Sequence, residues 1–200
     1  MGKGVIAVYS SSSQVIDRSY FQAARELCLQ MVRRGWSMVY GAGQLGLMGE
    51  CARTIRQAQG DAKIYGVIPD ALNVPGVVYE HCDELTVTRT MGERKRLMEE
   101  KADAFVALPG GFGTLEEILE VITLKQLGYH EKPIVLLNAG GFYEKLLGQF
   151  DCSIEQGFAR QDCRELYFVA KNGAEALDHI EAYQPVQLAP KWKNKTVPTT

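Results

Sequence analysis

The sequence has no long apolar run and almost no imbalance of charge, and each absence narrows the range of functions. No run approaches the ~20 apolar residues that a membrane-spanning helix needs, and the first ten residues hold too short an apolar stretch for a secretory signal. The 22 basic residues nearly balance the 24 acidic ones, so the charge predicts no binding to nucleic acid or to an anionic membrane. We therefore predict a cytoplasmic protein whose partner is a small molecule.

The cysteines and histidines also lack the spacing of a metal site. The five cysteines are odd in number, widely scattered and never arranged as C-x-x-C. The three histidines share no motif. We expect buried or unreactive thiols, with no metal and no cofactor.

Short β-rich runs alternate with longer amphipathic stretches along the chain. Strands are predicted at 4–9, 36–40, 63–68, 84–88, 103–108, 133–137 and 166–169. Helices are predicted from about 21 to 34 and at 47–59, 90–101, 113–127, 142–155 and 174–183. This order predicts one α/β domain at 1–183, with a doubly wound, Rossmann-like parallel sheet between two helical layers. Residues 184–200 contain three prolines and are predicted to form an extended or disordered tail.

A glycine-rich loop between a buried strand and an amphipathic helix is the strongest functional signal. Gly110, Gly111 and Gly113 lack Cβ atoms, so backbone N–H groups can approach a ligand closely, and the helix N-terminus attracts anions. Thr114 adds a hydroxyl, and Glu117 lies about one turn into the helix. The loop predicts a cradle for a phosphate whose sugar lies near Glu117; the alternative is a tight turn in which glycine only relieves crowding.

A second glycine loop at 41–49 matches G-x-G-x-x-G, but its position argues against a dinucleotide site. The loop follows the second predicted strand instead of the first, and Asp61 falls before the third strand instead of at its end. We interpret it as a packing turn that brings the following helix against the cradle.

Three cations, Arg94, Lys95 and Arg96, lie within one turn at the start of the helix that precedes the cradle strand. They cannot share one helical face, and a solvated charged face is the simplest explanation. The helix begins beyond the carboxyl edge of the sheet, however, where ligands bind in such folds. This position allows Arg94 to point into the crevice.

Together these loops resemble the LOG (Lonely Guy) family of cytokinin riboside 5'-monophosphate phosphoribohydrolases. The family's P-G-G-x-G-T-x-x-E motif is present from Pro109 to Glu117, and its G-L-M-G element from Gly46 to Gly49. Its Arg-Lys pair corresponds to Arg94 and Lys95, although the histidine of the family's M-H-x-R-K is Gly92 here.

The resemblance implies hydrolysis of the N-glycosidic bond of an N6-modified AMP, which gives the free base and ribose 5-phosphate. It implies Arg94 and Glu117 as catalytic residues. The residues that it implies for substrate binding are Met91, Lys95, Gly110, Gly111, Phe112, Gly113, Thr114, Glu116 and Thr123. It also implies a homodimer, for which Ile118, Val121, Ile122 and Leu124 offer apolar positions on one helix.

Two alternatives stay open at this stage. Relatives of this fold resemble molybdenum-cofactor carriers, which bind a phosphorylated pterin without hydrolysing it, and a nucleosidase of nucleotide salvage would act on plain AMP. An older label for such sequences, lysine decarboxylase, finds no pyridoxal-phosphate lysine motif here.

Overall fold

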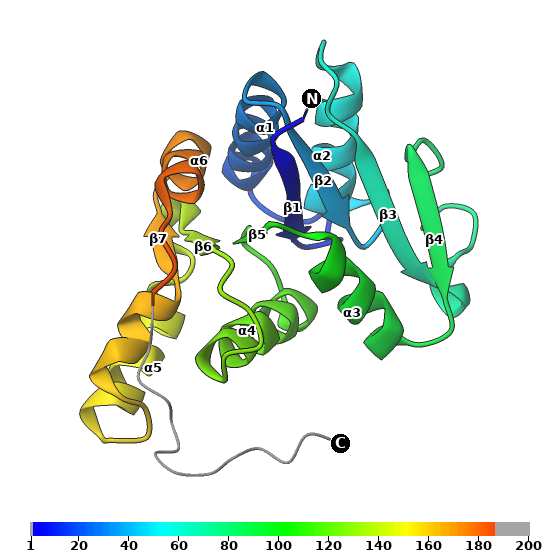
Figure 1. Cartoon of the computed structure of the whole chain (residues 1–200). Coiled ribbons are helices and arrows are strands. Elements are labelled where there is room, and N and C mark those ends of the chain that lie inside the picture. The colour runs from blue at the N-terminus through cyan, green and yellow to red at the C-terminus, as the bar shows by residue number, and fades with distance from the viewer. Residues whose placement is uncertain (1, 187–200) are drawn as a thin grey trace.

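The computed structural model of the chain describes residues 2–186, and a seven-stranded parallel sheet forms its centre (Figure 1). The strands follow the order β4-β3-β2-β1-β5-β6-β7. Their bounds are β1 Gly4–Tyr9, β2 Trp36–Tyr40, β3 Ile64–Pro69, β4 Glu84–Thr88, β5 Ala104–Ala107, β6 Ile134–Leu137 and β7 Phe168–Ala170. The predicted α/β class with a Rossmann-like sheet is confirmed.

Helices cover both faces of the sheet because the central strands are apolar on both sides. Ile6 and Val8 of β1 share one core with α1, α2 and α6, whereas Ala7 and Tyr9 share a second core with α3, α4 and α5. The helical bounds are α1 Arg18–Arg33, α2 Gly46–Gln57, α3 Met91–Lys101, α4 Phe112–Gln126, α5 Glu144–Glu155 and α6 Gly173–Ala182. Alternate side chains of one strand therefore anchor two helical layers.

The start of α3 is fixed by side chains close to it in the sequence. The Thr90 hydroxyl accepts a hydrogen bond of 3.1 Å from the Glu93 N–H, and the Glu93 carboxylate accepts one of 2.8 Å from the Arg89 N–H. Such reciprocal caps satisfy N–H groups that a helix end leaves without partners. The caps start the helix at Met91, so that Arg94 lies one turn inside it.

The predicted elements differ from the observed ones mainly at their ends. The last strand was expected at 166–169, but a 3-10 helix at Gln161–Leu166 places Leu166 in the core, and β7 begins at Phe168. The expected loop at 69–80 contains a short 3-10 helix at Asp70–Leu72 and one antiparallel bridge between Gly43 and Val78.

The predicted tail is described only at its beginning. Residues 184–186 form neither helix nor strand, and the rest of the predicted tail, 187–200, lies outside the described residues. Within residues 2–186, no helix is long and apolar enough to cross a membrane.

Candidate active site

The site lies where the strand order reverses, between β1 and β5. Chains that leave neighbouring strands toward opposite faces open a crevice at the carboxyl edge of such a sheet. The loop after β1 and the cradle after β5 begin side by side, because the Leu108 N–H donates a 2.9 Å hydrogen bond to the Tyr9 carbonyl. The predicted cradle is therefore at the position where α/β proteins bind ligands.

The N-terminus of α4 is open to an anion. Its N-cap is Gly111, which has no side chain to cap the first N–H groups of the helix. Cβ atoms built on Gly111 or Gly113 would meet nothing within 4 Å among the described residues. By contrast, a Cβ on Gly110 would collide with Thr114 Oγ1 and lie 2.5 Å from Thr114 Cβ. Gly110 thus allows the buried Thr114 to pack beneath the loop. The first-turn N–H groups of α4 have no partner within the helix, as at any helix start, and can donate to an anion.

The cradle is held from below by Tyr143, which precedes α5. The Tyr143 hydroxyl is buried and donates a 2.6 Å hydrogen bond to the carbonyl of Leu108, immediately before Pro109. Burial raises the pKa of Tyr143 above its ordinary value, so the hydroxyl keeps its proton as a donor throughout the neutral range.

Replacing Tyr143 with phenylalanine is expected to lower the free energy of unfolding by about 1 to 3 kcal/mol, because the Leu108 carbonyl loses its hydroxyl partner in a buried site. Urea denaturation measures this change. Tyr129→Phe is the matched control, since Tyr129 is 76% exposed; equal stability of the two variants would show that the bond does not support the cradle.

Arg94 and Glu117 form a buried ion pair between α3 and α4. Arg94 Nη1 lies 3.0 Å from Glu117 Oε1, and the two side chains are only 10% and 9% exposed. Arg94 Nε also donates a 3.3 Å hydrogen bond to the carbonyl of Val67 in β3. Burial raises the pKa of Glu117 and the positive charge of Arg94 opposes this rise, so the arginine helps to keep the carboxylate ionised.

Gly41 provides the space that Arg94 occupies. A Cβ atom on Gly41 would collide with Arg94 Nη2 and lie 2.9 Å from Arg94 Cζ. Further along the same loop, Gly46 has a φ of +56° and the Leu47 N–H donates a 2.9 Å hydrogen bond to the Ser11 carbonyl. The loop packs α2 against the loop after β1, and the predicted packing of α2 against the cradle itself stays a prediction. The first glycine of the loop also makes room for the ion pair.

Lys95 and Glu116 lie beside the buried pair and contact each other. Lys95 Nζ lies 2.5 Å from Glu116 Oε1 and 2.6 Å from Glu120 Oε2. Glu116 is exposed, whereas Glu117 is buried. These contacts tie α3 to α4, which favours a supporting position for both predicted residues.

The structure places the other predicted residues at different distances from the cradle. Met91 and Phe112 begin α3 and α4 and are 46% and 92% exposed, so their apolar side chains are free to contact a ligand. Thr123 lies about 13 Å along α4 from Thr114, given a rise of 1.5 Å per residue, and its hydroxyl donates to the Leu119 carbonyl. Within one chain, Thr123 is not brought to the cradle.

Two residues at the end of β1 belong to this region and were not predicted from the sequence. Tyr9 is buried, and burial and then the negative charge of Glu117 raise the pKa of its hydroxyl. The hydroxyl of Ser10 is enclosed and has no hydrogen-bond partner among residues 2–186. Their position at the carboxyl end of the first strand, beside the switch in strand order, was the available signal.

The apolar stripe predicted for a dimer on α4 is wrong in two of its four members. Ile118 and Val121 are fully buried in the core of the same chain, because they face the sheet. Ile122 and Leu124 are only partly buried, and Leu119 is 37% exposed. Any partner of α4 would therefore meet these last three residues.

Comparisons with known proteins find relatives that match most of this chain. The family model described as "Possible lysine decarboxylase" matches residues 48–180. Cytokinin riboside 5'-monophosphate phosphoribohydrolase LOG of Oryza sativa subsp. japonica is 43% identical over 180 residues, which cover 90% of this chain and 74% of the relative. LOG2 of Arabidopsis thaliana, which has the same activity in its name, is 41% identical over 180 residues, or 90% of this chain and 84% of the relative.

A solved structure of similar fold is named for a different function. The molybdenum cofactor carrier protein of Chlamydomonas reinhardtii superposes with a TM-score of 0.67 at 25% identity, and the match covers 90% of this chain and 96% of that one. Similar folds therefore occur in proteins named as hydrolases and in a protein named as a cofactor carrier, and the residues of the site must distinguish the two functions.

Proposed function

The chain belongs to the LOG family of cytokinin riboside 5'-monophosphate phosphoribohydrolases, and we propose that it hydrolyses the N-glycosidic bond of N6-modified adenosine 5'-monophosphates. The observation that carries the proposal is the buried pair of Arg94 on α3 and Glu117 on α4. Glu117 lies about one turn inside α4, next to the glycine-rich N-terminus of that helix. A carrier needs the cradle, but it has no need of a buried carboxylate beside the sugar.

The geometry suggests how the nucleotide is held. The phosphate accepts hydrogen bonds from N–H groups at the start of α4, where Gly111 and Gly113 leave free space. The ribose then lies toward Glu117, and the base contacts the exposed apolar side chains of Met91 and Phe112. Lys95 and Glu116 support the site from the side.

Glu117 acts on the positive charge that develops as the bond to the base breaks. The anomeric carbon becomes cationic in the transition state, and an adjacent carboxylate stabilises it. Water adds its oxygen to this carbon and releases a proton, the bond to the base breaks, and the departing base takes up one proton in balance. Ribose 5-phosphate is the second product. A guanidinium does not give up its proton near neutrality, so Arg94 is no general acid. Its role is to position Glu117 and to hold it ionised.

The description "Possible lysine decarboxylase" implies other chemistry, which we do not propose. The sequence contains no pyridoxal-phosphate lysine motif, and the lysine nearest the site, Lys95, pairs with Glu116 and Glu120. The two ion pairs favour a structural role for Lys95.

The phosphate should dominate substrate recognition. Two charge-assisted hydrogen bonds and the helix dipole contribute about 3 to 7 kcal/mol, which corresponds to roughly 10²-fold or more in kcat/KM. We expect isopentenyladenosine monophosphate to release free base at least that much faster than isopentenyladenosine does, as measured by chromatography of the products.

AMP, assayed in parallel, separates the proposal from its rivals. Faster release of adenine than of isopentenyladenine would favour nucleotide salvage, and no base from any substrate would favour a carrier. Equal turnover of the nucleoside and the monophosphate would contradict the phosphate cradle.

We further propose a cytoplasmic homodimer. The exposed face of α4 offers Leu119 and the partly buried Ile122 and Leu124, and Thr123 lies on the same helix. A symmetric dimer through α4 would bring Thr123 toward the partner's site. Sedimentation analysis of the purified chain measures the oligomeric state.

A further inference from the structure

A second cavity, far from the cradle, contains a buried lysine. It lies between α4, α6 and the segment around β7 and has a volume of about 340 Å³. Lys125 enters it from α4, about 12 Å further along the helix than Glu117 by the rise per residue. The cavity walls that matter here come from Ile134, Leu166, Tyr167, His179 and Tyr183.

Lys125 has no anionic partner to balance its charge. The residue is 7% exposed, and it forms no ion pair or hydrogen bond within residues 2–186. Residues 187–200 contain no aspartate or glutamate, so they offer no side-chain carboxylate either. Glu165 also lines the cavity, but it lies beyond 4 Å from the amine. A buried ammonium without such a partner is costly to the fold.

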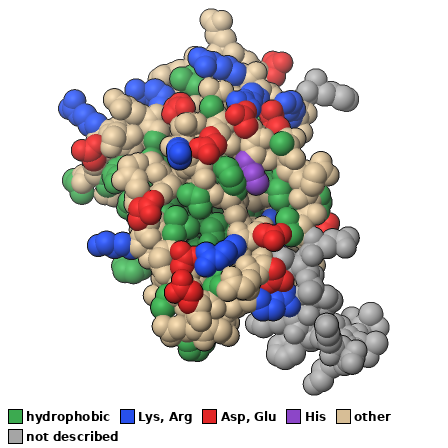
Figure 2. Space-filling view, turned by 90° about the vertical axis from the view of Figure 1, so that its left-hand side faces the viewer, with side chains coloured by type: hydrophobic (Ala, Val, Ile, Leu, Met, Phe, Trp, Pro, Cys, Tyr) green, Lys and Arg blue, Asp and Glu red, His purple; other side chains and the backbone are tan. Residues whose placement is uncertain are grey.

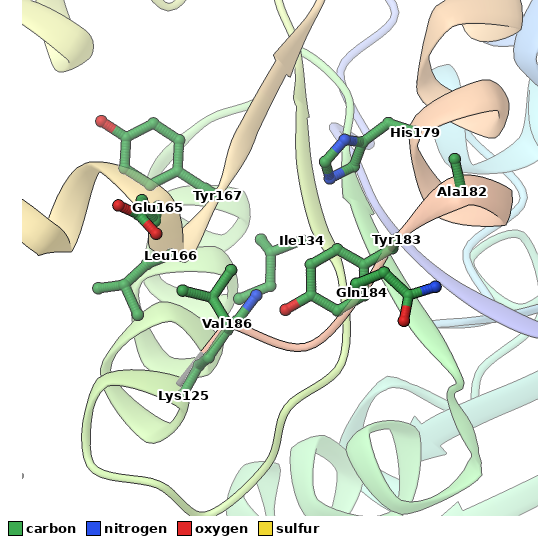
Figure 3. A pocket seen from close by; sticks show the side chains of 10 residues that line it. All are labelled: Lys125, Ile134, Glu165, Leu166, Tyr167, His179, Ala182, Tyr183, Gln184 and Val186. Carbon is green, nitrogen blue, oxygen red and sulfur yellow. The ribbon is translucent and has the colours of Figure 1, made fainter. Parts of the chain in front are cut away.

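The surroundings of the amine are aromatic and apolar. Its nitrogen lies 4.6 Å from the centre of the Tyr183 ring, and Figure 3 shows Lys125 extending toward the side chains of Val186 and Tyr183. The ring of His179, another lining residue, stacks on the ring of Phe168. The cavity belongs to the part of the molecule that carries α5, α6 and β7. Figure 2 shows this side of the molecule, and hydrophobic side chains gather near its centre.

We propose that this cavity binds a small aromatic carboxylate, whose carboxylate pairs with the Lys125 amine and whose ring packs against the apolar walls. The ligand supplies a negative charge in contact with the amine, which Glu165 does not. The volume lies at the small end of the range for ligand pockets. The site is separate from the proposed hydrolysis and does not depend on it.

Binding should depend on pH through Lys125. Burial lowers the pKa of Lys125 to about 8. Burial also lowers the pKa of His179 and His130 and raises that of Tyr167 and Tyr183, so none of these neighbours gains or loses charge between about pH 7 and 9. Because the anion binds the protonated amine, its affinity should be constant below pH 8 and fall roughly tenfold per pH unit above it.

NMR titration of the full-length protein with benzoate tests the proposal, because chemical-shift changes locate the ligand. We expect shifts around Ile134 and Tyr183 at millimolar benzoate, and binding roughly tenfold or more weaker for benzyl alcohol, which lacks the charge. Lys125→Met keeps most of the side-chain volume and should lower the affinity for benzoate by a similar factor. Lys145→Met, on the exposed surface of α5, is the matched control and should bind as the unaltered protein does.

Three results would overturn the inference. The first is that benzoate causes no chemical-shift change at the cavity. The second is that a folded Lys125→Met protein binds benzoate as tightly as the unaltered protein does. The third is that AMP displaces benzoate, which would place the ligand in the cradle. Failure of base release in the hydrolysis assay would leave this test unaffected, so the two proposals fail separately.

Discussion

Replacing Glu117 with glutamine will lower the rate of base release about 10³-fold, the loss that accompanies removal of one strong electrostatic contact to a transition state. The amide is nearly the same shape as the carboxylate and has no charge with which to stabilise the cationic sugar. Product chromatography under single-turnover conditions measures the rate. Binding of the monophosphate should change far less, because the cradle at Gly110 to Thr114 is untouched.

The fold should survive this substitution. Complete loss of one member of a buried ion pair costs roughly 3 to 5 kcal/mol, but the glutamine amide oxygen can still accept the hydrogen bond from Arg94. Glu116→Gln, at the adjacent position, is the matched control for the rate of base release. Glu116 is exposed and its contact with Lys95 is a surface one, so we expect less than about a tenfold loss of rate. A Glu117→Gln protein with near-normal turnover would remove this residue from the mechanism.

The architecture could be predicted from the sequence because each strand carries its own signal. Runs such as that at 104–107 are apolar at every position, which indicates a strand buried on both faces, and glycine or proline marks most of the boundaries. The last strand is predicted to begin two residues too early, at Leu166. A buried apolar residue at this position fits a strand as well as the end of a 3-10 helix. Only the packing of the preceding 3-10 helix decides which element contains it.

The site could be predicted in part, because the cradle is a local feature and the ion pair is not. The residues from Pro109 to Glu117 lie together in the chain, so their spacing alone indicates an anion site. Arg94 meets Glu117 only because α3 and α4 cover the same face of the sheet. Lys125 resembled an ordinary basic residue in the last turn of a helix, and nothing in the sequence indicated that it is buried.

Gly41→Ala should disable the enzyme although neither Arg94 nor Glu117 is itself replaced. The new methyl group would collide with Arg94 Nη2, so the guanidinium must leave its place beside Glu117. A displacement of about 1 Å in an active site can cost ~10²-fold in rate, and we expect at least this loss in kcat. Gly92→Ala is the matched control on the helix that carries Arg94, since its Cβ would lie 3.9 Å from Thr90 Oγ1, an ordinary contact.

The pH profile should reveal why Gly41→Ala is impaired. In the unaltered protein Arg94 opposes the rise that burial causes in the pKa of Glu117; with the guanidinium displaced, this pKa rises further. Because the ionised carboxylate is the active form, activity must then be lost at a higher pH as the solution is acidified. A Gly41→Ala protein with a lower kcat but an unchanged acid limb would show that the methyl group acts elsewhere, most directly through Met48, whose Cε would lie 2.9 Å from it. An acid limb moved upward, with thermal unfolding unchanged, would instead show that one glycine of the second loop sets the ionisation of a carboxylate on α4.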